Sequence, residues 1–215
     1  MIIKWLGHSC FLVISAAGVR VVTDPYSTGG DISYSPIAEA ADVVVISHEH
    51  NDHNAASAVR GEPEVVRGVG TKTVRGIQFR GIATYHDKSG GRERGNNTVF
   101  CFTVDDVRLC HLGDLGHLLT RTQGAEIGAV DILFVPVGGF YTIDAGDASR
   151  VCDQLKPKVI IPMHFKTAKC DYPISVVDDF VLSKQNVREA HSSEIETSLE
   201  DLPAGTDIVL LEPSR

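Results

Sequence analysis

Residues 42–53 read DVVVISHEHNDH, a run of apolar residues followed directly by three histidines and an aspartate. The apolar half predicts a buried strand, because a continuous run of β-branched residues is typical of a strand that is covered on both faces. Such a strand requires further layers above and below it. The segment therefore predicts a layered α/β fold with a polar cluster at the end of a central strand.

The polar half of the segment has the composition of a metal site. In extended backbone, residues two apart point the same way, so His48 and His50 can face one point in space. Asp52 and His53, where the strand turns into a loop, can face a neighbouring point. Neutral imidazole and carboxylate are the ligands expected for zinc, manganese or iron. The alternative is a solvated polar loop, which this concentration of ligand types disfavours.

Further candidate ligands follow other predicted strands, because one loop cannot complete two coordination shells. Each comes directly after an apolar, strand-like run, and we expect them to converge with the 48–53 cluster at one edge of the sheets. They are His86, Asp114 and His164, after strands predicted at 77–83, 107–112 and 158–162.

The rest of the chain is β-rich at first and then alternates between strands and helices. The simplest architecture is two sheets packed face to face with helices outside, in a single domain of residues 1–215. The other predicted strands are 2–6, 11–14, 19–22, 65–67, 98–104, 131–137 and 208–211. Helices are predicted at 54–60, at 148–155 with Asp147 as N-cap, and at 176–184 with Ser175 as N-cap.

Composition narrows the class of protein. The formal net charge of −8 over 215 residues argues against broad binding of nucleic acid or anionic membranes, which requires a basic face. Five cysteines without Cys-x-x-Cys spacing indicate buried free thiols. No signal peptide is visible, and the apolar runs are far shorter than the ~20 residues that cross a bilayer. We therefore expect a cytoplasmic protein.

The spacing of these residues resembles the metallo-β-lactamase superfamily, whose His-x-His-x-Asp-His motif matches residues 48–53. The segments WLGHSCF (5–11), TDP (23–25), HLGD (111–114) and PVGG (136–139) are similar to its small branch of β-lactamase-like zinc-dependent hydrolases. That branch is similar to the ascorbate-6-phosphate lactonase and ribonuclease Z groups. The resemblance implies an αββα four-layer sandwich of two mixed β-sheets with outer helices and metals at one sheet edge.

The resemblance also implies two divalent metal ions, zinc by expectation, with manganese or iron as alternatives. An aspartate at 114, where zinc β-lactamases carry a thiolate, argues against that activity, and His50 in place of glutamate argues against the diiron flavoproteins. The long basic arm of ribonuclease Z enzymes is not visible, so a transfer-RNA nuclease is not expected. One ion would take His48, His50 and His86, the other Asp52, His53 and His164, and Asp114 would bridge them.

Some residues near these ligands are open to two interpretations. Asp24 either supports a metal-bound histidine or caps the Asp24-Pro25 turn. His8 either lies at the site, where it would contact substrate, or is a core histidine. His117 is a candidate for the pocket wall, whereas alternation along the strand suggests that His111 points away from Asp114.

The segment 88–97 is the densest basic stretch in an acidic chain, and its glycines permit a mobile loop. Either it is solvated, or Lys88, Arg92 and Arg94 bind an anionic group of the substrate. Tyr141, in a segment that follows another strand, is a candidate for the opposite wall of the pocket.

The function expected from these residues is metal-dependent hydrolysis of an ester, lactone or phosphodiester bond in a small, anionic substrate. Asp52 and Asp114 would orient the attacking water in addition to binding metal. The alternative is a metal-binding regulatory or scaffold module without turnover. The sequence does not indicate an oligomeric state.

Overall fold

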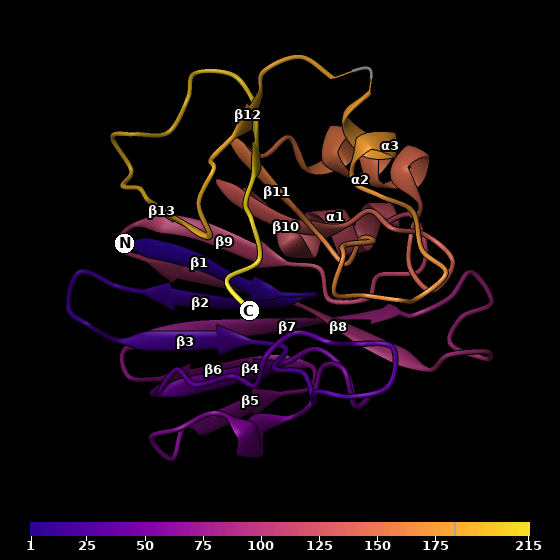
Figure 1. Cartoon of the computed structure of the whole chain (residues 1–215). Helices are drawn as coiled ribbons and strands as arrows, with labels where there is room; N and C mark the ends of the chain where they lie inside the picture. Colours follow the sequence, from indigo (N-terminus) through magenta and orange to yellow (C-terminus); the bar gives the residue numbers. More distant parts are fainter. Residues whose placement is uncertain (183) are drawn as a thin grey trace.

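Two mixed β-sheets lie face to face in the computed structural model, which describes residues 1–182 and 184–215 (Figure 1). Within those residues the first sheet has six strands in the order β13-β1-β2-β3-β4-β5. The pairs β3–β4 and β4–β5 are parallel, and the others are antiparallel. The strands are β1 (Ile2–Gly7), β2 (Cys10–Ile14), β3 (Arg20–Thr23), β4 (Val43–Ile46), β5 (Glu64–Arg67) and β13 (Glu194–Glu196).

The second sheet has eight strands in the described residues, in the order β12-β14-β11-β10-β9-β8-β7-β6. The half from β6 to β9 is an antiparallel meander, whereas the half from β9 to β12 is parallel. The strands are β6 (Gly70–Val74), β7 (Ile77–Tyr85), β8 (Asn96–Val104), β9 (Val107–His111), β10 (Ile132–Pro136), β11 (Val159–Met163), β12 (Val187–Glu189) and β14 (Asp207–Leu210).

Large apolar side chains from both sheets fill the space between them. Phe11 on β2 and Phe134 on β10 meet across this space with their ring centroids 4.4 Å apart. Trp5 on β1 stacks on Phe11 from the same sheet. All three side chains are at most 1% exposed. Burial of each contributes about 1.5–3 kcal/mol to folding, which makes this layer the main apolar core.

The strand that was predicted to be covered on both faces is β4. Val43 and Val45 belong to the core between the sheets, whereas Val44 and Ile46 belong to a second apolar cluster on the outer face. Tyr26 and other side chains of the irregular segment 25–41 cover that outer face. The continuous apolar run is thus explained by a covering layer on each side of β4.

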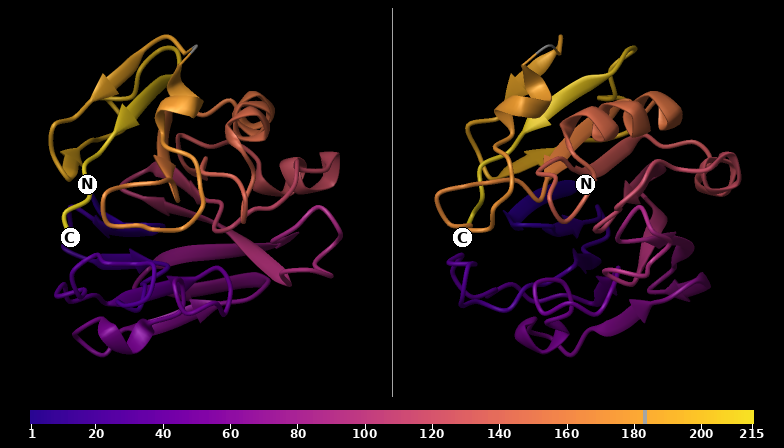
Figure 2. Two further views of the ribbon diagram at one scale, coloured as in Figure 1. Left: turned by 45° about the vertical axis from the view of Figure 1, so that its right-hand side comes forward. Right: turned by 90° about the vertical axis from the view of Figure 1, so that its right-hand side faces the viewer.

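The outer layers differ between the two sheets. Helices α1 (Arg121–Ile127), α2 (Ala145–Leu155) and α3 (Asp178–Val181) lie on the side of the molecule away from β3, β4 and β5 (Figure 2). On the first sheet, the outer layer in the described residues includes the 25–41 segment, the short 3₁₀ turn η1 (Ala56–Ala58) and the segment 170–174. The expected sandwich of two mixed sheets is confirmed, with its α-helices on one outer side.

The predicted helix boundaries need correction. Helix α2 begins at Ala145 rather than 148, because the side chain of Asp144, not that of Asp147, caps it and accepts a hydrogen bond from the Asp147 N–H. The helix predicted at 176–184 is reduced to α3, which has no side-chain cap in the structure. Ser183, within that predicted helix, lies outside the described residues. The helix predicted at 54–60 is reduced to η1.

Several elements escaped prediction. Helix α1 is preceded by Thr120, whose side chain forms a capping box with Gln123, a signal that the sequence already carried. Strands β6, β12 and β13 are short and mostly exposed, so they lack the apolar alternation that identifies a half-buried strand. Among the described residues, no helix is both long and apolar enough to cross a membrane.

The candidate site residues follow the ends of β1, β3, β4, β7, β9 and β11. Three of them, His8, Asp24 and His164, come directly after β1, β3 and β11 and have left-handed backbone with φ of 52°, 38° and 50°. This conformation is costly for residues other than glycine and tends to persist where the surroundings enforce it. Here it ends each strand abruptly and lets the side chains meet at one edge of the sandwich.

Candidate metal centre

The loop that follows β4 supplies the largest share of the site. His53 and Asn54 both donate their backbone N–H to the carbonyl oxygen of His50, so the chain turns sharply after the strand. The turn places His48, His50 and His53 on the same side of the loop. The ring centroid of His48 is 4.6 Å from that of His50 and 4.3 Å from that of His53. The local motif thus delivers three imidazoles to one small volume.

A first group of donor atoms comprises His48, His50 and His86. One ring nitrogen from each lies within 4.8 Å of the others. Nε2 of His48 and Nδ1 of His50 are 3.1 Å apart, a distance at which two imidazoles need a shared proton or cation between them. Burial lowers the pKa of His48 to about 3, so that its ring is neutral and able to donate a lone pair at pH 7.

A second group comprises His8, Asp52, His53 and His164, again with donor atoms within 4.8 Å of one another. His8 Nε2 lies 3.3 Å from Oδ2 of Asp52, and its ring centroid is 4.2 Å from that of His164. Burial lowers the pKa of His8 to about 4. The structure thus places His8 beside the expected ligands of the second ion, and of the two interpretations it supports a position at the site.

Asp114 lies between the two groups. Its Oδ2 is 3.0 Å from Nε2 of His86, 3.2 Å from Nε2 of His53 and 3.3 Å from Nε2 of His164. Burial alone would raise the pKa of Asp114, but His164 and His53 lower it well below its usual range. The carboxylate is therefore ionised and contacts histidines of both groups.

These donors fit a bound cation. Oδ1 of Asp114 is buried and has no hydrogen-bond partner within residues 1–182 and 184–215. A buried, ionised oxygen without a partner is costly, and a cation among the surrounding imidazoles would satisfy it. Asp114 also raises the pKa of His86 and His53 against the effect of burial. A cation would replace the protons that these rings otherwise hold.

Asp24 is a fully buried acceptor behind the ligands. Its Oδ1 accepts the Ser47 N–H at 2.7 Å, and its Oδ2 accepts the Ser47 hydroxyl at 2.6 Å. The same Oδ2 lies 3.0 Å from Nδ1 of His53 and 2.9 Å from Nε2 of His111. Burial opposes ionisation, but His111 and then His53 lower the pKa of Asp24 far below its usual range. The geometry thus favours the orienting role over the turn cap.

His111, which was expected to point away from Asp114 and was given no role at the site, contacts Asp24 instead. Its ring is fully buried and binds Asp24, so it belongs to the layer of residues that orients His53. Ser47 belongs to the same layer, because its hydroxyl also lies 2.9 Å from Nδ1 of His48. Neither residue had a local sequence signal for this role.

Asn97 positions the loop that carries Asp114. Its side-chain oxygen accepts the Asp114 N–H at 3.0 Å, and its amide nitrogen donates to the carbonyl oxygen of Leu112 at 2.9 Å. Gly113, between them, has a φ of 54°, and a Cβ there would come within 2.5 Å of Asn97 and Ser47. Glycine is therefore required at this position for Asp114 to reach the two groups of donors.

A cavity of about 320 Å³ opens over the two groups of donors. Arg94 and Tyr141 form part of its wall, with the guanidinium carbon 5.5 Å from the centroid of the tyrosine ring. Tyr172 was not predicted as a site residue, yet its hydroxyl lines the same cavity and donates to Oδ2 of Asp52 at 3.4 Å. The segment around Tyr172 carries no recognisable motif, so only the tertiary structure reveals it.

The basic loop is organised by Asp87, another residue that was not predicted. Its carboxylate accepts the backbone N–H groups of residues 89, 91, 93 and 94 at 2.8–3.0 Å. Burial alone would raise its pKa, but these bonds, led by that from Arg94, lower the pKa of Asp87 to about 2. The loop is thus tied down next to His86 and presents Arg94 to the cavity.

Three other predicted substrate contacts have partners outside this cavity. Lys88 is exposed and pairs with Asp147 at 2.8 Å. Arg92 is exposed, and its Nε donates to the carbonyl oxygen of Ser89. His117 accepts the Tyr85 N–H, and its other nitrogen lies 2.7 Å from the carbonyl oxygen of Leu118. Neither Arg92 nor His117 is among the residues that line the cavity over the metal centre.

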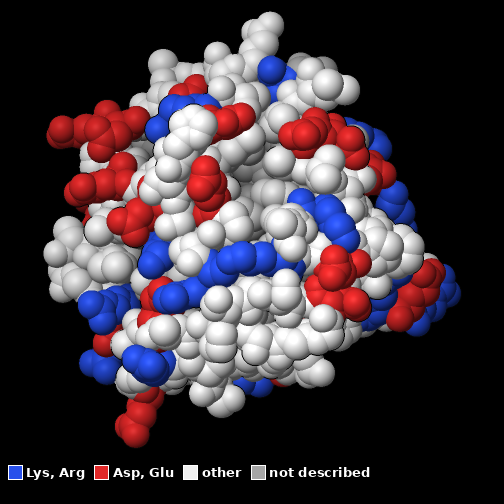
Figure 3. Space-filling view, in the orientation of Figure 1, with Lys and Arg blue, Asp and Glu red and all other residues white. Residues whose placement is uncertain are grey.

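Charged residues on the outside of the molecule carry both signs. Figure 3 shows acidic and basic side chains interspersed over the face seen in Figure 1. A surface built for nucleic acid gathers lysine and arginine on one face. Two expectations stay predictions: that nucleic acid is not a partner, and that the protein is cytoplasmic.

Comparison with known proteins identifies the family of the chain. A sequence profile for the β-lactamase superfamily domain matches residues 2–164, which include all the candidate ligands. A UPF0173 metal-dependent hydrolase of Carboxydothermus hydrogenoformans is 29% identical over 205 residues, covering 83% of this chain and 88% of the relative. A UPF0173 protein of Pyrococcus abyssi is 31% identical over 184 residues, covering 78% and 84%.

A solved structure is also similar over nearly the whole chain. The protein comes from Thermotoga maritima and is assigned to the Zn-dependent hydrolases of the metallo-β-lactamase superfamily. It is 38% identical to this chain, covers 98% of each chain and superimposes with a TM-score of 0.82. The sequence profile, the relatives and the fold agree, and the chain therefore belongs to the metallo-β-lactamase superfamily of metal-dependent hydrolases.

Proposed function

We propose that this hydrolase cleaves an ester, lactone or phosphodiester bond in a small anionic substrate and that it uses two divalent ions. The observation that carries the proposal is the position of Asp114. Its Oδ2 lies within 3.3 Å of a histidine from the first donor group, His86, and of two from the second, His53 and His164. A carboxylate in contact with two separate groups of ligands is suited to bridge two ions.

The donors divide between the two ions as follows. His48, His50 and His86 would hold one, and Asp52, His53 and His164 the other. A set dominated by imidazole favours zinc, with manganese or iron as alternatives. Such ions, when bound, generate a nucleophile from water at neutral pH and polarise the scissile carbonyl or phosphoryl oxygen.

The side chains around the ions have their own roles. Asp52 and Asp114 are both ionised, and they would accept a hydrogen bond from the attacking water and orient it. Tyr172 supplies a donor beside Asp52, because burial and then the nearby Asp52 carboxylate raise the pKa of its hydroxyl. A donor in this position can bind a substrate oxygen while remaining protonated at neutral pH.

Recognition of an anion is attributed to Arg94. It lines the cavity over the metals together with Glu93, while Lys88 is paired with Asp147 outside that cavity. The planar guanidinium offers paired donors to a phosphate or carboxylate, and the Tyr141 ring holds it over the cavity. The charge of the substrate is thus read at a distance from the scissile bond.

The proposal is tested with zinc-loaded and chelator-treated protein on two matched ester pairs, one member anionic and one neutral, and on a chromogenic phosphodiester. Turnover should require metal, should disappear in Asp114→Asn and should persist in Asp106→Asn, a change at an exposed turn. If the zinc-loaded protein binds metal with its full ligand set but hydrolyses none of these substrates, the proposed reaction is wrong. That result would favour the alternative function, a metal-binding regulatory module without turnover.

A further inference from the structure

Two of the five cysteines face each other on the second sheet, away from the metal centre. Cys101 on β8 pairs directly with Cys110 on β9 in the antiparallel register, and their Sγ atoms are 3.8 Å apart. Both thiols are free in the structure. Neither cysteine has a part in the proposed hydrolysis, so the pair requires another explanation.

The backbone at this pair suits a bond between the two sulfurs. Arg108, two residues before Cys110, turns its N–H toward the Asp131 carboxylate and its carbonyl oxygen toward the Asp131 N–H, away from β8. Residues two apart in a strand direct their backbone N–H and C=O groups to the same side, so those of Cys110 also point away from β8. Cys101 and Cys110 therefore form a non-hydrogen-bonded pair, in which Cα atoms lie about 4.5 Å apart, within the range of disulfides.

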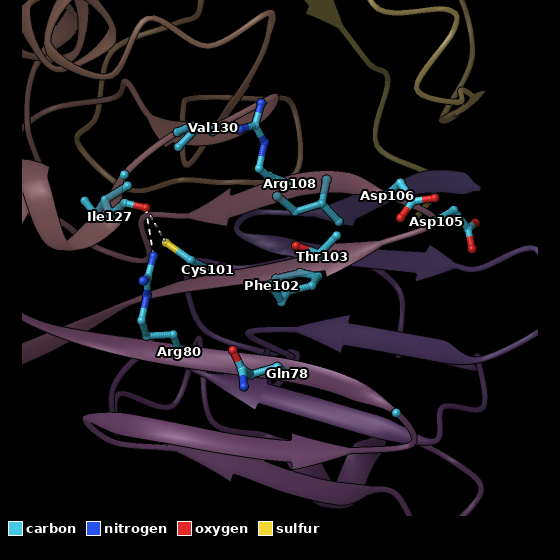
Figure 4. A pocket seen from close by; sticks show the side chains of 14 residues that line it. Gln78, Arg80, Cys101, Phe102, Thr103, Asp105, Asp106, Arg108, Ile127 and Val130 are labelled. Atoms are coloured by element: carbon cyan, nitrogen blue, oxygen red, sulfur yellow. Dashed lines mark hydrogen bonds between the residues drawn. The ribbon is translucent and has the colours of Figure 1, made fainter.

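One member of the pair is accessible and the other is not. Cys101 is half-buried and lines a cavity of about 760 Å³, the one drawn in Figure 4, whereas Cys110 is completely buried. Arg80 extends along the wall of the same cavity, and its NH2 donates to the carbonyl oxygen of Ile127 at 2.9 Å. Figure 4 shows the Cys101 sulfur and the Arg80 guanidinium directed toward that same oxygen.

We propose that Cys101 and Cys110 are a dithiol site that a small hydroperoxide converts into a cross-strand disulfide, which a dithiol reductant converts back. The Cys101 thiolate attacks the peroxide; the O–O bond breaks, an S–O bond forms, and the alcohol or water leaves with a proton. The Cys110 sulfur then attacks the Cys101 sulfenic acid; the S–O bond breaks, an S–S bond forms, and the hydroxyl leaves as water with the Cys110 proton. Two thiols are oxidised by two electrons, and one peroxide is reduced.

The surroundings favour this order of events. A hydrogen bond with Cys110 and, against the effect of burial, the Arg80 guanidinium lower the pKa of the Cys101 thiol. A cation beside a thiol favours the thiolate, which is the reactive form. Cys110, in contrast, is enclosed and positioned only to resolve an oxidised neighbour. The cavity admits a compact oxidant to Cys101 alone.

The disulfide would join strands that already pair, so it need not disturb the metal centre. Asn97 on β8 and Asp114 beyond β9 are each four residues from the cysteine on their side and remain connected by their own hydrogen bond. We expect zinc content to be unchanged and the midpoint of thermal unfolding to rise, because the link restricts the unfolded chain. These readouts separate the proposal from damage at the metal ligands.

Mass spectrometry tests the proposal on the zinc-loaded protein. After exposure to hydrogen peroxide, the protein is alkylated in denaturant and digested with trypsin, which cleaves after Arg94, Arg108 and Arg121. The expected product is a link between the peptides 95–108 and 109–121 that dithiothreitol removes. In Cys110→Ser, Cys101 should instead stop at a sulfenic acid that dimedone traps. Cys152→Ser, a change at another cysteine, should leave the link intact.

Two results would overturn the proposal. One is full alkylation of both cysteines after peroxide treatment that oxidises free cysteine in the same solution. The other is oxidation of Cys101 to a sulfinic acid in the wild-type protein without a link to Cys110, which would remove the resolving role. Both are read from the wild-type chain and do not depend on the folding of a variant.

Discussion

Asp24 holds His53 by the ring nitrogen that faces away from the metal centre, with Oδ2 3.0 Å from Nδ1. The other nitrogen, Nε2, faces the carboxylate of Asp114 at 3.2 Å. The two residues are 29 positions apart in the chain and come from the ends of β3 and β4, which are parallel neighbours. Asp24 thus determines both the orientation of this ligand and the nitrogen that is free for metal.

Asp24→Asn should weaken metal binding without removing a ligand. An amide cannot accept from Ser47 and both histidines as the carboxylate does, so His53 loses its orienting partner. Loss of such a partner typically costs 10–100-fold in metal affinity. A zinc competition titration against a chromogenic chelator measures the change. Asp106→Asn is the control, and equal affinities in the two variants would contradict the role of Asp24.

The two groups of donors predict two ions in each chain. Elemental analysis of zinc-loaded protein should give about two ions per chain, because seven ligands exceed the four of one tetrahedral ion. His164→Ala should reduce the value to about one by weakening the second site. His191→Ala, a change at an exposed histidine, should leave it at two. A value of one for the wild type, unaffected by His164→Ala, would refute the two-metal centre.

Arg94→Ala should lower kcat/KM selectively for anionic substrates. Loss of a hydrogen bond to a charged group costs about 1.5–3 kcal/mol, or roughly tenfold to 150-fold in kcat/KM. A neutral analogue with the same scissile bond should lose little. Arg92→Ala is the matched control, since Arg92 is exposed outside the cavity over the metals. Equal losses on both substrates would mean that Arg94 supports the loop or the metals rather than the anion.

The stability of the chain should depend on Asp131 in a pH-dependent way. Its carboxylate accepts bonds from the backbone N–H, Nε and NH2 of Arg108 at 2.6–2.8 Å. These bonds lower the pKa of Asp131, with burial opposing them. A carboxyl group whose pKa is lower in the folded state than in the unfolded state stabilises the folded state at pH values above its unfolded pKa of about 3.9. This stabilisation fades as the pH falls through the folded pKa.

Asp131→Asn should therefore destabilise the protein more at pH 7 than at pH 3. We expect a loss of about 1–2 kcal/mol at pH 7, at the lower end for charged bonds because Arg108 is half exposed. Urea unfolding of metal-free wild type and variant at both pH values measures the difference, and the absence of metal excludes titration of bound ligands. A loss that grows toward pH 3 would show that the sign of the linkage is wrong.

Local patterns were enough to predict most of the buried strands and to propose the first half of the candidate metal site. The 42–53 segment combines an apolar run that is typical of a doubly covered strand with histidines spaced two apart. Both signals act over a few residues. The same holds for the positions of His86, Asp114 and His164 after apolar runs. Helix boundaries were less predictable, since Asp144 and Asp147 are both chemically suitable caps and the surrounding contacts select Asp144.

The residues that surround the ligands were decided by the tertiary structure. Asp24 meets His111, 87 residues away, because β9 of the second sheet ends opposite β3 of the first. Tyr172 reaches Asp52 across 120 residues, and Cys101 meets Cys110 through the register of a hairpin. A buried polar group takes whichever partner the strand order brings within hydrogen-bond distance. The sequence thus determined which residues can bind metal, and the packing of the two sheets decided which residues orient them.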